Sequence, residues 1–379
     1  NLYPILGNRV ENALRDHGFD EKTTILHGNP VLPNEQSIIR ILTEIDERPR
    51  IMIAVGSGTI TDMVRFVSSR TKCDFISLPT APSMDGYAST GSALTLEGMK
   101  HTIICKAPKA IFADIEVLKN APQAMIASGF GDVIGKYTSL ADWALGHLLW
   151  NDVYSSEIAL RTSKNIETCV QLIPGYHNNP DATIRALIDA LIDVGICMLL
   201  VGNSRPASGS EHHCSHFWEL KHLREGLPDV SHGMKVGFAE TLITQKYEQL
   251  RKISVEDVRK LLAHATHPQP EQEIHTIQTV YGSIADTIIS TQEKFIYMSE
   301  ESQVELSGKI IEKWGEIQEI VQIVPPASHI RKLLDQVGIP TNPIDLHISN
   351  QEVEQALKYS HYLRPNFTIL KLLKFLGLQ

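Results

Sequence analysis

The chain has 379 residues, which suggests two domains, or one domain with a large appendage, and its 42% apolar and 21% charged residues are ordinary for a globular protein. The formal net charge of −9 disfavours a nucleic-acid partner, which would need a basic face, and requires any site for an anionic substrate to be locally basic. The most apolar run, "ALIDALIDVGICMLLVG", carries two aspartates and is too short for a bilayer, so we expect no membrane insertion.

The cysteine content favours a reducing compartment. There are five cysteines, an odd number, and no two of them form a C-x-x-C pair. We therefore expect free thiols and a cytoplasmic location.

Up to about residue 120, short apolar runs alternate with segments of helical periodicity. Strands are predicted for "TTILHG" (23–28), "RIMIAVGSG" (50–58), "CDFISLPT" (73–80) and "KAIFADIEV" (109–117). Helices are predicted for "NEQSIIRILTEIDE" (34–47) and "TITDMVRFVSS" (59–69). Such alternation predicts an α/β domain over 1–120, with a parallel sheet covered by helices.

A glycine turn, Gly56-Ser57-Gly58, follows the second of these strands and opens a helix. Glycines allow a pyrophosphate to approach the backbone, and the N–H groups of a helix start favour anions. Thr61 replaces the third glycine of G-x-G-x-x-G, and no P-loop lysine is present. An ordinary tight turn therefore remains the alternative to a dinucleotide site.

The segment "LPTAPSMDGYASTGSAL" (78–94) follows the next strand and has Asp85 as its only charge. In doubly wound sheets ligands lie beyond the carboxyl ends of the strands, where both this loop and the glycine turn fall. The alternative is a solvated connection in which Asp85 caps a turn.

From about residue 121 the rhythm changes, and the rest of the chain (121–379) is predicted to be an all-helical domain. Helical spacing of apolar residues is seen in "DVIGKYTSLADWALGHLL", "SSEIALRTSKNIETCVQLI", "ATIRALIDALIDVGICMLL" and "SVEDVRKLLAHA". Residues 267–273, "HPQPEQE", are expected to form an exposed loop.

Asp132 and Lys136 stand one helical turn apart within "ASGFGDVIGKYTSLADW". Flanking glycines make Asp132 accessible, so it is the best carboxylate candidate for a metal ligand. The alternative is that Asp132 is a helix cap and Lys136 a solvated surface charge.

The stretch "GSEHHCSHFWELKHLREGLPDVSHG" (209–233) holds five histidines and one cysteine. Ser208 and Glu211 fit a capping box, and a helix beginning there places His212 and His216 on one face, with His232 following 20 residues after His212. Cys214 would lie on another face. A solvent-facing pair is the alternative, because the H-E-x-x-H motif is absent. With a carboxylate from elsewhere, the histidines would suit zinc, nickel or iron.

Taken in order, these segments resemble the glycerol-1-phosphate dehydrogenases. That family belongs to a larger group with glycerol dehydrogenase, iron-dependent alcohol dehydrogenases and dehydroquinate synthase. The resemblance runs over almost the whole chain and rests on "GSGTITD", "LPTAPSMDGYAS", "GFGDVIGKYTSLADW", "PASGSEHHCSH" and "SHGMKVG". It implies a dehydroquinate synthase-like fold. The family also begins with a strand–glycine–helix unit not found here, and the chain starts at Asn1, so we expect a trimmed N-terminus.

The resemblance assigns roles to individual residues. It implies a divalent metal held by Asp132, His212 and His232, with His216 orienting a ligand or relaying a proton, and Asp85 near the substrate hydroxyls. The dinucleotide, NAD or NADP, would lie over Gly56, Ser57, Gly58, Thr59, Thr80 and Ser89.

The implied reaction is the reversible, NAD(P)H-dependent reduction of dihydroxyacetone phosphate to sn-glycerol 1-phosphate. The metal would be nickel or zinc, and the enzyme a cytoplasmic homodimer. Because the phosphate needs a cation, we predict that Lys136 binds it.

Three other functions stay open at this point. The chain could be a dehydrogenase of unphosphorylated glycerol or another polyol. It could be a lyase like dehydroquinate synthase that uses NAD transiently, although that branch has glutamate in place of Asp132. It could also be a non-catalytic metal- and nucleotide-binding sensor.

Overall fold

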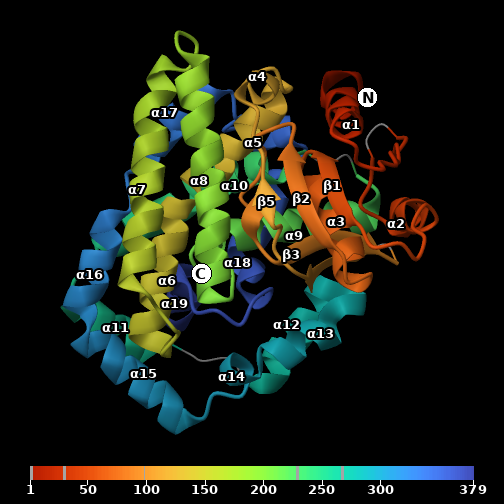
Figure 1. Cartoon of the computed structure of the whole chain (residues 1–379). Coiled ribbons are helices and arrows are strands. Elements are labelled where there is room, and N and C mark those ends of the chain that lie inside the picture. The colour runs from red at the N-terminus through yellow and green to blue at the C-terminus, as the bar shows by residue number, and fades with distance from the viewer. Residues whose placement is uncertain (1–2, 29–30, 98, 228–229, 266–268) are drawn as a thin grey trace.

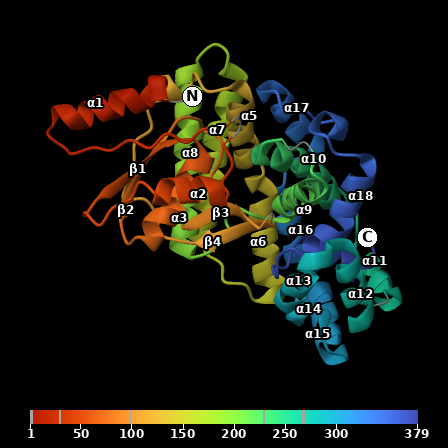
Figure 2. The ribbon, with the colours of Figure 1, turned by 90° about the vertical axis from the view of Figure 1, so that its right-hand side faces the viewer.

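The computed structural model describes residues 3–379 apart from 29–30, 98, 228–229 and 266–268. The strands of the N-terminal part lie on one side of the molecule, and a larger helical assembly lies on the other (Figures 1 and 2). This confirms the predicted class, a parallel α/β region followed by a largely helical one. The boundary at residue 120 stays a prediction.

A parallel sheet with the order β1-β2-β5 forms the centre of the N-terminal part. It consists of β1 (Ile51–Gly56), β2 (Asp74–Pro79) and β5 (Ala110–Ile111). The crossover between β1 and β2 is α3 (Gly58–Arg70), as predicted. Because β1 and β2 end at the same edge, the segments that follow them are neighbours, and the Thr80 N–H donates to the Gly56 carbonyl at 3.1 Å.

A two-stranded antiparallel hairpin of β3 (Gly91–Leu96) and β4 (Met99–Ile104) was not predicted. It begins inside the segment 78–94 that was expected to be a loop. The Ser, Thr and Gly content of that segment indicated a loop, but the pairing with β4 depends on a later segment. Figure 2 shows β3 and β4 on the side of the N-terminal part that faces the helical assembly, and β4 contacts α9 (Ser210–Glu225).

The strand predicted at residues 23–28 is wrong, because this segment has no strand structure. A strand requires a neighbour to accept its hydrogen bonds, and β1 is an edge strand of the sheet that the described residues form. A short apolar run such as this one does not reveal whether such a neighbour exists.

The remaining helices of the N-terminal part are α1 (Asn8–Asp16), α2 (Glu35–Leu42) and α4 (Ile115–Leu118). The first helices of the second part are α5 (Gln123–Ile134), α6 (Lys136–Trp150), α7 (Ser156–Leu172), α8 (Pro180–Val201) and α10 (His232–Arg251). The last are α11 (Val255–His264), α12 (Pro270–Tyr281), α13 (Ala285–Thr291), α14 (Glu293–Ile296), α15 (Glu300–Glu312), α16 (Trp314–Ile323), α17 (Ala327–Val337), α18 (Asn350–Tyr359) and α19 (Ile369–Phe375).

The start of α12 and the break between α5 and α6 differ from what the sequence predicted. The predicted loop at 267–273 is wrong from Pro270 on, where α12 begins, and its residues 267–268 lie outside the described part of the chain. Asp132 and Lys136 do not share one helix, because α5 ends at Ile134 and α6 begins at Lys136. Gly135 between them keeps right-handed helical angles, so the two side chains remain one turn apart.

Helices α5 and α10 pack directly against each other near the centre of the molecule. Among the described residues, two apolar cores form around them, one centred on α5 and α8 and the other on α9, α10 and the C-terminal helices. The first core also takes in Tyr87 and Leu118 of the N-terminal part. Among the helices described, none has the length and hydropathy that a bilayer crossing would need.

Candidate metal centre

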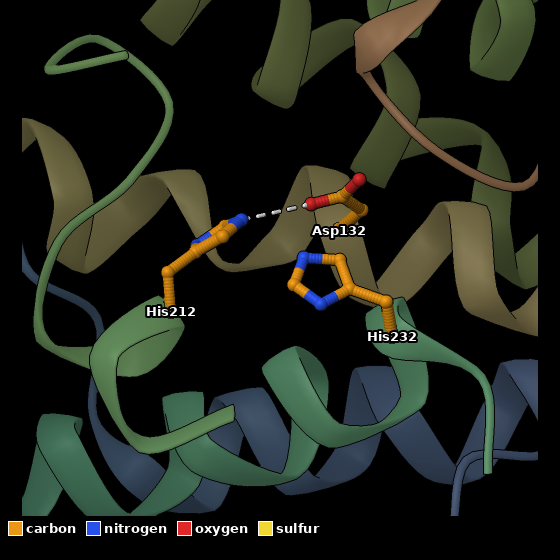
Figure 3. Close-up of side chains that lie close together, drawn as sticks. All are labelled: Asp132, His212 and His232. Atoms are coloured by element: carbon orange, nitrogen blue, oxygen red, sulfur yellow. Dashed lines mark ion pairs between the residues drawn. The ribbon is translucent and has the colours of Figure 1, made fainter. Parts of the chain in front are cut away.

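The three residues predicted as metal ligands come together from three helices (Figure 3). Asp132 lies in the last turn of α5, His212 in the first turn of α9, and His232 begins α10. One ligand atom from each lies within 4.8 Å of the others, and His212 Nε2 is 3.3 Å from Asp132 Oδ1. His212 follows Asp132 by 80 residues and His232 follows His212 by 20, yet the three side chains lie close together in the fold.

Each histidine of this cluster forms a hydrogen bond with a buried carboxylate through its Nδ1 atom. Nδ1 of His212 lies 2.8 Å from Glu211 Oε1, and Nδ1 of His232 lies 2.7 Å from Glu219 Oε1. These bonds fix the ring orientations and leave Nε2 of each ring for a metal, as in carboxylate–histidine–metal arrangements. The donor set, one carboxylate and two imidazoles, therefore fits a divalent transition metal such as zinc or nickel.

The electrostatics of the cluster also favour a cation. Burial alone would raise the pKa of Asp132, but Lys136 and His212 hold it well below its usual range. Burial and the nearby Lys136 would lower the pKa of His212, yet the bonds to Asp132 and Glu211 raise it to about 9. The carboxylates that stabilise the protonated form of His212 would also stabilise a divalent cation bound at the same place.

Lys136 ties the loop after β2 to α5. Its ammonium is buried, 2.7 Å from Asp85 Oδ2 and 3.0 Å from Asp132 Oδ1, and the Asp85 N–H donates to Asp132 Oδ2 at 2.9 Å. The helix-cap alternative is wrong, because Asp132 lies within α5 and the residues that flank α5 and α6 are Pro122, Gly135 and Asn151. The alternative of a solvated surface lysine is wrong as well, because Lys136 is fully buried. The structure does not test phosphate binding by Lys136, but it gives the ammonium two carboxylate partners.

A buried arginine of α3 holds the same loop from the opposite side. Arg65 pairs with Asp62 and donates to the carbonyl oxygens of Gly86, Tyr87 and Gly91, at 2.6 to 2.9 Å. Four acceptors around one guanidinium fix the backbone next to Asp85. The sequence analysis did not identify Arg65, because its partners are backbone atoms that a sequence pattern cannot show.

His216 lies next to the predicted ligands, on the more open side of the cluster. Its ring stacks on that of His232 at a centroid distance of 5.2 Å, and its Nδ1 is 3.1 Å from Glu219 Oε2. Burial lowers the pKa of His216 to about 3, so the ring is neutral at neutral pH. His216, Glu219 and His232 form a second cluster with metal-ligand atoms, but Glu219 is engaged by other cations.

Sequence reasoning missed the roles of Glu211 and Glu219. Glu211 was assigned to a capping box with Ser208, which is wrong, since the N-cap is Gly209 and its N–H donates to Glu211 Oε1 at 2.8 Å. Glu219 follows His212 by seven residues and His216 by three, so it shares their helical face. A carboxylate on the face of the histidines is the signal that would have found Glu219, whereas Glu211 is the sequence neighbour of His212 and does not share its face.

The predicted nucleotide-binding residues gather where the sheet ends. Gly56, Ser57, Gly58 and Thr59 form the turn from β1 into α3, and Thr80 and Ser89 are buried in the loop after β2. A Cβ on Gly58 would lie 2.6 Å from the Met84 sulfur, so the backbone and the loop are in close contact there. Nucleotide binding by these residues stays a prediction.

Comparison with known sequences finds relatives that align with nearly the whole chain. Residues 1–122 match the family model for iron-containing alcohol dehydrogenase. A glycerol-1-phosphate dehydrogenase [NAD(P)+] of Geobacillus thermodenitrificans is 36% identical over 341 residues, covering 90% of this chain and 75% of the relative. The corresponding protein of Bacillus licheniformis is 33% identical, covering 99% of this chain and 80% of the relative.

Solved structures support the same fold. An iron-containing alcohol dehydrogenase from Corynebacterium glutamicum superimposes with a TM-score of 0.56 at 15% identity, covering 97% of this chain and 84% of that one. A sulfoacetaldehyde reductase from Bifidobacterium kashiwanohense gives 0.55 at 14% identity, covering 100% and 89%. At these identities the likeness concerns the fold alone.

Proposed function

Because this chain belongs to the glycerol-1-phosphate dehydrogenase family, we propose that it reduces dihydroxyacetone phosphate to sn-glycerol 1-phosphate, reversibly and with NAD(P)H. The observation that carries the proposal at the level of chemistry is the convergence of Asp132, His212 and His232 beside the carboxyl edge of the sheet. Relatives that bear this activity in their names align with 90% or more of the chain.

The roles of the residues follow from their positions. A divalent metal bound by Asp132, His212 and His232 would supply Lewis-acid polarisation of a ketone oxygen, and NAD(P)H would supply the hydride. Glu211 and Glu219 orient the two imidazoles. Lys136 balances the charge of Asp132 and holds Asp85 where it can accept a hydrogen bond from a substrate hydroxyl.

His216 is the residue we assign to substrate contact and proton relay. Its neutral ring lies beside His232, and its side chain is 25% exposed, so a bound substrate and solvent can both reach it. The glycine turn Gly56-Ser57-Gly58 with Thr59, together with Thr80 and Ser89, would hold the dinucleotide at the edge of the sheet.

Three finer points of the proposal rest on the family resemblance. These are nickel or zinc as the metal, a homodimer as the assembly, and the cytoplasm as the location. The size of the purified protein in solution would test the homodimer.

The proposal is tested by NADH oxidation after the protein has been stripped by a chelator and then supplied with zinc, nickel or iron. We expect one metal to restore turnover with dihydroxyacetone phosphate and little turnover with dihydroxyacetone. Equal rates on both ketones would support a polyol dehydrogenase instead, and inactivity with every metal would reject the proposal.

The metal content of two variants tests which of the two candidate ligand sets binds the metal, Asp132, His212 and His232 or His216, Glu219 and His232. Asp132→Asn is expected to bind less than one tenth of the wild-type metal, because it removes a ligand charge. His216→Ala is expected to retain the metal and lose turnover by about 100-fold, as for loss of an acid–base group. Mass-spectrometric metal analysis of the purified variants provides the readout, and the reverse pattern would assign the metal to His216, Glu219 and His232.

A further inference from the structure

A basic cluster lies on the open side of the metal centre, and its two lysines, Lys100 and Lys235, have no role in the reaction as described so far. Glu219 lies at its middle, 5% exposed, and is bonded by His216, His232, Lys100 and Lys235. The ammonium groups of Lys100 and Lys235 thus share the carboxylate of Glu219. In a chain of net charge −9, this is a local environment suited to an anion.

The three lysines joined to the site differ in how far solvent or a ligand can reach them. Lys136 is fully buried between Asp85 and Asp132, and Lys235 is fully buried with its Nζ 3.3 Å from Glu219. Lys100 is 31% exposed, on the side where His216 and His232 are 25% and 28% exposed. Lys100 is therefore the lysine of this set that a phosphate can contact without displacing the core.

We propose that Lys100 binds the phosphate group of the substrate, and that this contact selects a phosphorylated ketone over an unphosphorylated one. The inference rests on the proposed function and names the residue that its substrate specificity requires. Only one carboxyl group, that of Glu219, separates the ammonium of Lys100 from the ring of His232. The phosphate of dihydroxyacetone phosphate is likewise a few bonds from its ketone oxygen.

Glu219 fixes where Lys100 lies. Lys100 belongs to β4 of the N-terminal hairpin, and Glu219 belongs to α9 of the helical part, 119 residues later. The ion pair holds a flexible lysine side chain at the metal centre before the substrate arrives, which lowers the entropy lost on binding. The phosphate site is thus assembled from both parts of the chain.

The test compares the substitution Lys100→Met with Lys106→Met in the metal-loaded enzyme. Lys106 is a matched control because it is 34% exposed and also pairs with a carboxylate, Asp74 at 3.1 Å, at the start of β2. We expect Lys100→Met to lower kcat/KM for dihydroxyacetone phosphate about 10- to 100-fold, the loss typical of one charge-assisted hydrogen bond. The KM for NADH and the rate with dihydroxyacetone should not change, and Lys106→Met should match the wild type.

A second measurement keeps the inference testable if the rate with dihydroxyacetone is too low to measure, and a second variant does so if Lys100→Met fails to fold. Inorganic phosphate should inhibit the wild type competitively against the substrate and inhibit Lys100→Met more weakly. Lys100→Arg retains the charge and should restore most of the discrimination.

The outcomes separate this inference from the proposed function. If the wild type prefers the phosphorylated ketone and Lys100→Met keeps that preference, Lys100 is not the phosphate ligand. Equal losses on both ketones, or a higher KM for NADH alone, would overturn it in favour of a structural or nucleotide-binding role. A wild type without any preference would reject the proposed function, and this inference with it.

Discussion

At the scale of single residues, the metal centre depends on carboxylates that would not touch the metal. Glu211 accepts hydrogen bonds from His212 Nδ1, from the Gly209 N–H and from the Thr138 hydroxyl, the last at 2.9 Å. The Thr138 hydroxyl also contacts Glu240, whose pKa is raised well above its usual range by burial and by the charge of Glu211. The raised pKa of Glu240 favours its protonated form, whereas, despite burial, the bond to His212 lowers the pKa of Glu211 and favours a negative charge next to His212.

The first prediction concerns this carboxylate. Glu211→Gln replaces one acceptor oxygen by a donor, so His212 loses its charged partner, and metal affinity should fall about 10- to 100-fold. A competition titration against a chelator measures the change. Glu116→Gln, at an exposed carboxylate of α4, is the control. Unchanged affinity in Glu211→Gln would show that the Glu211–His212 bond does not orient the ligand.

At the scale of elements, the metal ligands come together because α5 and α10 touch backbone to backbone. A Cβ on Gly131 would lie 2.0 Å from the Gly233 oxygen, and a Cβ on Gly233 would lie 1.8 Å from the Ser128 oxygen. Each of these glycines is the sequence neighbour of a ligand, Asp132 or His232. The glycine contact therefore sets the distance between the two ligands.

Gly131→Ala is expected to force α5 away from α10. The overlap should lower the free energy of unfolding by about 1–3 kcal/mol, as overpacking does, and should weaken metal binding as well. Denaturant unfolding with a parallel metal titration provides both readouts. Gly308→Ala, in an exposed turn of α15 with open space around the Cβ position, should instead stabilise by about 0.5–1 kcal/mol. Similar effects of the two substitutions would refute the packing argument.

At the scale of the whole molecule, the C-terminal helix α19 is a core element. It lies next to α6, because the N–H of Ile369 donates to Asp142 Oδ1 at 2.6 Å. All but one of its seven residues are buried, including Lys371. The ammonium of Lys371 donates to Gln292 Oε1 at 2.8 Å and to two backbone carbonyls. Burial and the nearby Arg205 lower the pKa of Lys371 to about 7.

The lowered pKa of Lys371 makes stability depend on pH. Between pH 7 and the ordinary lysine pKa the unfolded chain binds the proton and the folded chain does not, so stability rises with pH. From pH 7 to pH 9 the wild type should gain about 2 kcal/mol relative to Lys371→Met. Urea unfolding of both proteins at the two pH values tests this, and a constant difference between them would show that Lys371 keeps its proton in the folded state.

Local sequence determined much of the fold and the predicted ligand set. Strands β1 and β2, helix α3 between them and the change to helices after residue 120 follow from apolar periodicity, which depends only on near neighbours along the chain. Asp132, His212 and His232 were assigned as ligands through the family resemblance, which rests on compact motifs that include "GFGD", "GSEHHCSH" and "SHG".

Only the tertiary structure decided which side chains and backbone atoms contact the residues of those motifs. The β3–β4 hairpin, the Lys100–Glu219 pair, the Arg65 contacts to backbone oxygens and the glycine contact between α5 and α10 join residues far apart along the chain. Segment 23–28 shows the converse, since its short apolar run favoured a strand but it has no sheet neighbour. Periodicity reports how one segment would bury its apolar side, whereas hydrogen-bond partners and ion pairs depend on which segments meet in the folded chain.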